Sequence, residues 1–193
     1  MISGAETLWR DAGLGDLGLR HLALADLGAV AAALLPGEGY THPGGEPATL
    51  SETRQALRGF AENGSDAGFV ATRRADDAPV GFLLYRLRNR LAEDFGEGNV
   101  LGALSPRLFP ADGRFVQVHD LWVDPAWRRR GVARTLKQIA ELAAASEGIG
   151  MIYTVTEADH SAALALNAGL GYVEIYLGPM WDAVERVALA KYL

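Results

Sequence analysis

The chain has 193 residues, of which 49% are hydrophobic and 22% charged, and it carries a formal net charge of −6. This balance is typical of a soluble globular protein with one sizeable core. The negative charge argues against a nucleic-acid partner, and no apolar run reaches the roughly 18 residues that span a bilayer. The absence of cysteine excludes disulfides, Cys–metal sites and thiol nucleophiles, which fits a cytoplasmic protein. We also expect no membrane partner and no metal site.

The N-terminal half alternates between short apolar patterns and turn residues. Residues 1–18 are rich in glycine and weakly patterned, so we expect a tail or a short helix there. A glycine- and proline-rich loop is expected at 36–47, and it holds Tyr40 and His42. The elements expected around this loop are a strand at 19–22, helices capped by Asp26 and Ser51, and strands at 67–72 and 80–87.

An unusually long connection follows the strand at 80–87. Residues 88–113 carry seven large apolar side chains and an acidic stretch, which is more than a solvated loop would carry. We expect this insertion to pack over the domain or its cleft, or to form a homodimer contact. The apolar residues are Leu91, Phe95, Val100, Leu101, Leu104, Leu108 and Phe109.

The C-terminal half is dominated by one strand, turn and helix unit. Residues 115–123 alternate as a strand, Asp124-Pro125 ends it, and the apolar spacing from Val132 onward predicts a helix. Later expected elements are a strand at 151–156, a helix at 161–168, and strands at 172–177 and 184–192.

The turn before this helix has the composition of an anion site. The first amides of a helix lack partners inside the helix, and the helix dipole makes that end positive. The segment adds three consecutive arginines and Gly131, which allows close approach, so we expect it to bind a phosphate or pyrophosphate. The residues concerned are Arg128, Arg129, Arg130, Gly131, Val132 and Ala133.

The spacing Arg128-x-x-Gly131-x-Ala133, after a strand and before a helix, resembles the acyl-CoA-binding motif of the GNAT superfamily of N-acetyltransferases. The resemblance implies an α+β fold with a mixed, mostly antiparallel sheet flanked by helices, formed by one domain over 19–193. It also implies two splayed parallel strands, where acetyl-CoA would bind along the backbone of Leu121, Trp122 and Val123. His160 stands where this superfamily carries an Asn that contacts the pantetheine arm, and the alternative is an exposed histidine without a role. The resemblance also implies that the loop at 36–47 shapes the acceptor pocket, so Tyr40 and His42 either touch a substrate or lie in a solvated loop.

His119 is the first candidate for the general base. Imidazole side chains titrate near neutrality, and strand alternation would place His119 on one face with Gln117, Leu121 and Val123. Some members of the superfamily carry a histidine at this place, and others carry a catalytic Glu where Gln117 stands, but an amide cannot act as a base. Asp120 is the rival base, and the alternative for His119 is a structural strand histidine.

The residue expected to act as general acid departs from the superfamily pattern. Asn167 occupies the position where relatives often carry a tyrosine, and an amide can donate a hydrogen bond to sulfur but cannot supply a proton. Because the chain has no cysteine nucleophile, we expect direct acetyl transfer from acetyl-CoA to a primary amine of a small molecule or peptide. The alternative is a catalytically weak CoA-binding sensor or scaffold. A nucleotide-binding domain is disfavoured because neither Gly-rich nucleotide motif occurs.

Overall fold

The computed structural model describes residues 5–35, 49–62, 66–89 and 101–193. The expected loop residues Tyr40 and His42, and the first half of the insertion with Leu91, Phe95 and Val100, lie outside these ranges. The chain divides into two compact units. The first comprises Met1–Tyr85 and Asp120–Ile139, and the second comprises Arg86–His119 and Ala140–Leu193.

The strands form a mixed, mostly antiparallel sheet in the order β1-β2-β3-β4-β5-β7-β6. The neighbours β4 and β5 are parallel, whereas the pairs β1–β2, β5–β7 and β6–β7 are antiparallel. Every predicted strand is present with its ends shifted by at most two residues, which confirms the α+β class. The strands are β1 (Leu17–His21), β2 (Asp66–Arg73), β3 (Pro79–Asn89), β4 (Arg114–Val123), β5 (Met151–Glu157), β6 (Val173–Pro179) and β7 (Glu185–Tyr192).

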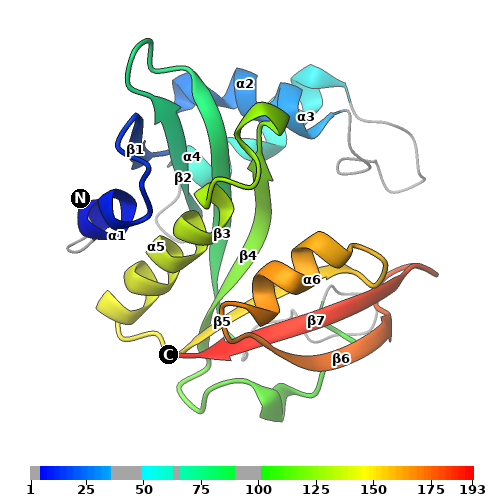
Figure 1. The fold of residues 1–193 in the computed structure, drawn as a ribbon. Coiled ribbons are helices and arrows are strands. Elements are labelled where there is room, and N and C mark those ends of the chain that lie inside the picture. Colours follow the sequence, from blue (N-terminus) through cyan, green and yellow to red (C-terminus); the bar gives the residue numbers. More distant parts are fainter. Residues whose placement is uncertain (1–4, 36–48, 63–65, 90–100) are drawn as a thin grey trace. The chain divides into compact units, whose positions relative to one another are not determined.

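In the first unit, helices α2 (Leu27–Leu34), α3 (Leu50–Leu57) and α4 (Gly59–Glu62) cover one face of the strands (Figure 1). Their apolar residues form a core with Phe82 and Leu84 of β3 and with the half-buried Trp122 of β4. On the opposite face, Gly81 lets Val132 of α5 (Val132–Ser146) approach the sheet, because a Cβ at Gly81 would meet the Val132 Cγ1 at 3.3 Å. The short helix α1 (Ala5–Asp11) is joined to β1 by a bond from Trp9 Nε1 to the Leu17 carbonyl.

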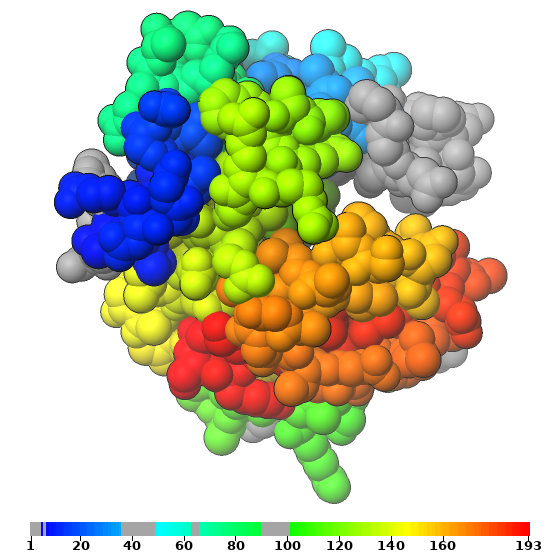
Figure 2. Space-filling view, viewed as in Figure 1, coloured from blue at the N-terminus to red at the C-terminus, as the bar shows by residue number. Residues whose placement is uncertain are grey.

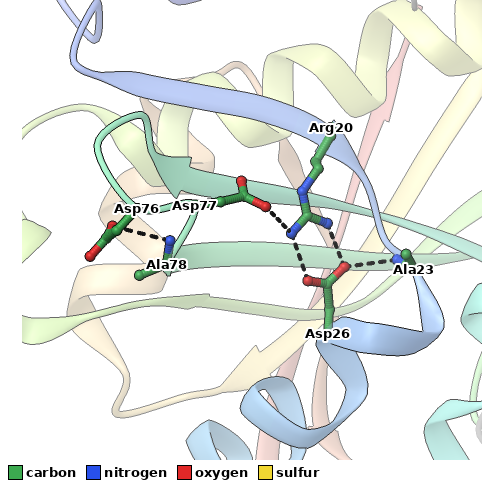
Figure 3. A network of polar contacts seen from close by, with 6 residues as sticks. All are labelled: Arg20, Ala23, Asp26, Asp76, Asp77 and Ala78. Atoms are coloured by element: carbon green, nitrogen blue, oxygen red, sulfur yellow. Dashed lines mark hydrogen bonds and ion pairs between the residues drawn. The ribbon is translucent and has the colours of Figure 1, made fainter.

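Two helix starts differ from the sequence prediction. Thr49, rather than Ser51, is the N-cap of α3, and its side chain and Glu52 form a reciprocal capping box. Asp26 stands at the N-cap of α2, but its side chain makes no capping bond there. Its carboxylate instead accepts bonds from both Nη atoms of Arg20, at 2.6 and 2.8 Å, and from the Ala23 amide (Figure 3).

In the second unit, the described part of the insertion packs on the sheet of that unit. Leu101, Leu104 and Phe109 are buried, and the Phe109 ring contacts the rings of Phe115 in β4 and Tyr153 in β5. Burial of such side chains supplies the free energy that holds an irregular segment in place. The opposite face of this unit carries the C-terminal half of α5 and, after it in sequence, α6 (Ser161–Ala168). Two contacts indicate this: Glu141 of α5 binds Lys191 of β7, and the ring of Tyr172, which follows α6, lies against the same lysine.

Candidate functional site

The segment between β4 and α5 has the backbone of an anion-binding turn. Asp124 caps a short 3₁₀ turn, Pro125–Trp127, by accepting the Ala126 amide at 2.8 Å. Arg129 and Gly131 then adopt positive φ values of 64° and 91°, and α5 begins at Val132. A Cβ placed on Gly131 would meet no atom within 4 Å, so the space above this glycine is open to a ligand.

The amides at the start of α5 are available for such a ligand. The first helical bond in this turn runs from the Thr135 amide to the Gly131 carbonyl at 2.9 Å. The amides of Val132 and Ala133 have no acceptor four residues back within the helix, and the helix dipole adds positive potential there. Pyrophosphate binding at this backbone stays a prediction.

The three arginines of this turn have different roles. The Nε of Arg128 donates to the Val123 carbonyl at 3.0 Å, which fixes the turn to the end of β4. The guanidinium of Arg130 lies 4.8 Å from the ring centroid of Trp127, a cation–π contact. All three arginines are exposed, so the turn carries formal positive charge at the surface.

The faces of β4 can be assigned within each unit. In the first unit Val123 lies on the side of Gly81 and α5. In the second unit Phe115 packs in the core around Tyr153, and the ladder pairs Val116 with Ile152 and Gln117 with Tyr153. Within the second unit, Gln117 therefore lies on the face of Phe115 and Tyr153.

The parallel ladder of β4 and β5 is short. Within the second unit it contains the pairs Val116–Ile152 and Gln117–Tyr153. Among the described residues of this unit, Thr154 to Glu157 of β5 have no ladder partner on the side of β4. On its other side, β5 stays paired with β7 as far as Glu157. An edge of this kind leaves backbone N–H and C=O groups for another extended chain.

Two candidate residues of β4 lie next to this edge. His119 is half-buried and thus within reach of solvent. Gln117 is buried, and its Oε1 accepts a bond from the Nε of Arg88 at 3.1 Å. Asp120, the rival base, belongs to the first unit and is also half-buried.

The two candidate residues near α6 differ in exposure. Asn167 is 4% exposed, and its Nδ2 donates to the Ala163 carbonyl one turn earlier at 2.9 Å. Part of the hydrogen-bonding capacity of Asn167 is therefore used inside the helix. His160 is exposed at the N-cap of α6, with its Nδ1 3.5 Å from the Thr156 hydroxyl.

A buried polar group in the second unit was not predicted from the sequence. The Nζ of Lys191 lies 2.5 Å from Glu141 Oε2, and also faces the Tyr172 ring at 5.9 Å. Burial, and then the charge and hydrogen bond of Glu141, raise the pKa of the Tyr172 hydroxyl. The signal for this ion pair in the sequence was a charged residue, Glu141, next to the apolar stripe of α5. A sequence pattern could not show that its partner is Lys191, on a strand 50 residues later.

Within the residues that the structure describes, no three His, Cys, Asp or Glu side chains form a group that could hold a metal ion. No helix in those ranges is both long and apolar enough to cross a membrane.

Comparison with known proteins identifies the architecture. The profile of the Acetyltransferase (GNAT) family matches residues 38–172. No curated protein matches the chain.

Solved structures share the fold. NAA60 from Arabidopsis thaliana in complex with acetyl-CoA aligns with a TM-score of 0.67 at 13% identity, covering 92% of this chain and 98% of that chain. The yncA protein from Salmonella typhimurium with acetyl-CoA gives 0.66 at 14%, covering 93% and 95%. The spermidine/spermine N-acetyltransferase SpeG from Vibrio cholerae gives 0.65 at 14%, covering 92% and 94%.

Proposed function

The chain belongs to the GNAT family of acetyltransferases, and we propose that it transfers an acetyl group from acetyl-CoA directly to a primary amine of a small molecule or peptide. The observation that carries the proposal is the turn from Arg128 to Ala133, with its positive-φ glycine, open space and unpaired helix amides. Two solved proteins share the fold. NAA60 is described in complex with a bisubstrate analogue, and SpeG is described as a spermidine/spermine N-acetyltransferase.

In this proposal the turn holds the CoA pyrophosphate. The amides from Arg129 to Ala133 would donate to the phosphate oxygens, and the exposed arginines would supply charge. Arg128 would act indirectly, since its bond to the Val123 carbonyl keeps the turn in its conformation. The backbone of Leu121, Trp122 and Val123 would then bind the pantetheine arm as an added strand, and exposed His160 could contact that arm.

The chemistry requires removal of one proton from the attacking ammonium and departure of a thiolate. His119 is our candidate for the base, acting through water, because it is half-buried beside the open edge of β5. We assign Asn167 at most a hydrogen-bonding role, since its amide already donates to Ala163. Proton delivery to the thiolate then falls to water. The same two observations favour the second candidate function, a catalytically weak CoA-binding sensor.

Two measurements on the same preparation separate these functions. Acetyl-CoA at about 100 times its dissociation constant should stabilise the fold by about 2.7 kcal/mol in a thermal unfolding assay. Release of free CoA thiol should then depend on an added amine. A thermal shift without amine-dependent thiol release would favour the sensor, and the absence of any shift would remove both functions.

A homodimer is a further part of the proposal, with the insertion at 88–113 as one possible contact. Static light scattering of the intact chain, compared with a variant in which 91–108 is replaced by a short glycine-containing turn, tests it. A mass that is monomeric in both preparations would exclude the dimer.

A further inference from the structure

The hairpin between β2 and β3 lies beside the turn that follows β4 in the first unit. In Figure 2 the blue-green atoms of this hairpin adjoin the lime-green atoms of the turn at the surface. The amide of Asp124, one residue after the end of β4, donates to the Val80 carbonyl of β3 at 2.9 Å. The hydrogen bonding between the neighbouring strands β3 and β4 therefore continues into the turn that leads to α5.

Gly81, the next residue of β3, leaves no room for a side chain at this place. A Cβ there would lie 3.0 Å from the Trp122 carbonyl oxygen and 3.3 Å from the Val132 Cγ1. Trp122 lies near the end of β4, and Val132 is the first residue of α5. Strand β3 thus contacts both elements that the turn connects, and the size of the residue at 81 sets how closely they approach β3.

The hairpin that provides these contacts is itself bound to β1. The Nη2 of Arg20 in β1 lies 3.2 Å from Asp77 Oδ2 in the hairpin turn, and the same guanidinium binds the buried Asp26 (Figure 3). The Arg74 amide donates to the Asp16 carbonyl, just before β1, at 3.0 Å. These bonds hold the hairpin turn, so β3 starts from a fixed position in the sheet.

The turn after β4 has a backbone that needs support from outside. Arg129 has φ 64°, which is unfavourable for a residue with a side chain. Within the turn, the Arg128 bond to the Val123 carbonyl and the Asp124 cap act as braces. A ligand that binds through several backbone amides needs all of them in place, and a displacement of well under 1 Å weakens such a site.

Resting on the proposed function, we propose that β3 positions the turn from Asp124 to Gly131 for acetyl-CoA, acting through Gly81 and the Val80 carbonyl. Neither residue contacts the cosubstrate in this assignment. Gly81 lets β4 and α5 close on β3, and the Val80 carbonyl fixes the Asp124 amide. The amides that follow are then held where one pyrophosphate can meet them together. Gly81 and Val80 are positioning residues.

Two glycine variants of the intact protein test this proposal. Gly81→Ala would press on the backbone of Trp122 and should weaken acetyl-CoA binding about tenfold in titration calorimetry. Gly68→Ala in β2 is the matched control, because a Cβ there would meet Leu84 Cδ2 at 2.8 Å and the Leu83 carbonyl at 3.0 Å, and β3 separates β2 from β4. The control should lower the melting temperature at least as much, but keep the dissociation constant within about twofold of the parent value.

A second pair of variants isolates the hydrogen bond to Val80. Asp124 has φ −50° and ψ 132°, which suit proline, and its side chain accepts the Ala126 amide. Asp124→Ala removes only the side-chain bond, whereas Asp124→Pro also removes the amide that donates to Val80. Asp124→Pro should therefore weaken acetyl-CoA binding about fivefold more than Asp124→Ala does.

Amide hydrogen exchange without ligand gives a measurement that does not depend on the proposed function. The segment from Asp124 to Thr135 should exchange about tenfold faster in Gly81→Ala than in the parent, and at the parent rate in Gly68→Ala. If the parent binds acetyl-CoA, equal affinity in the two glycine variants overturns the proposal, as does unchanged exchange of this segment in Gly81→Ala. A parent that binds no acetyl-CoA removes the proposed function, and the exchange comparison alone then decides whether β3 positions the turn.

Discussion

Replacing Gly131 by alanine separates the ligand-binding role of the turn from its role in the fold. Gly131 has φ +91°, which costs a residue with a side chain about 1–2 kcal/mol. The new Cβ would meet no atom within 4 Å, so no steric clash adds to this cost. Since 1 kcal/mol corresponds to roughly 2–4 °C for a chain of this size, the variant should unfold about 2–8 °C below the parent without ligand.

The ligand response should change far more than this. The added methyl group would stand in the open space through which a phosphate approaches the amides, so we expect the shift caused by acetyl-CoA, about 5–10 °C in the parent, to vanish. Gly13→Ala is the control, because Gly13 also has positive φ and a Cβ there also meets no atom within 4 Å. It should show the same loss of stability and the full ligand shift. If Gly131→Ala retains the shift, the assignment of the turn to the pyrophosphate is wrong.

Three further predictions concern the second unit. His119→Ala should lower turnover by roughly 10²-fold with little change in acetyl-CoA affinity, and unchanged turnover from pH 6 to 9 would make His119 structural. Tyr153→Phe should raise the free energy of unfolding by about 1 kcal/mol, because the buried Tyr153 hydroxyl has no hydrogen-bond partner among the described residues. Burial raises the pKa of Tyr153 in the folded state, so the unfolded state loses this proton first and the free energy of unfolding falls as the pH rises above the unfolded pKa near 10. Chemical unfolding between pH 8 and 11 should therefore show a smaller alkaline loss for Tyr153→Phe, and a loss identical to the parent would refute this. Lys191→Met should destabilise by roughly 3 kcal/mol because it leaves Glu141 buried without its ion-pair partner, and the double variant with Glu141→Leu should recover most of it; no recovery would contradict the pairing.

The elements could be predicted because local signals and tertiary contacts agree in most of this chain. Helix α6 begins and ends at the predicted residues, and the strand, proline and helix sequence around Pro125 is present. The start of α3 was misplaced by two residues because Thr49 and Ser51 are both good capping residues, and only Thr49 has Glu52 three residues later. The role of Asp26 was missed because its main partner, Arg20, lies on another element.

The same distinction between local signals and contacts with other elements applies to the candidate site. The anion-binding turn depends on backbone: a glycine at positive φ and the first amides of a helix, which a short motif specifies. Asn167 lies in a helix, as predicted, but its bond to the Ala163 carbonyl needs coordinates.

Gln117 and Asn167 stand where the superfamily pattern leads us to expect an acidic base and a tyrosine, and the side chain of each bonds within the protein. Gln117 accepts from Arg88, and Asn167 donates to the helix that carries it. A thioester is already activated, so positioning of donor and acceptor can supply much of the rate enhancement without a dedicated acid.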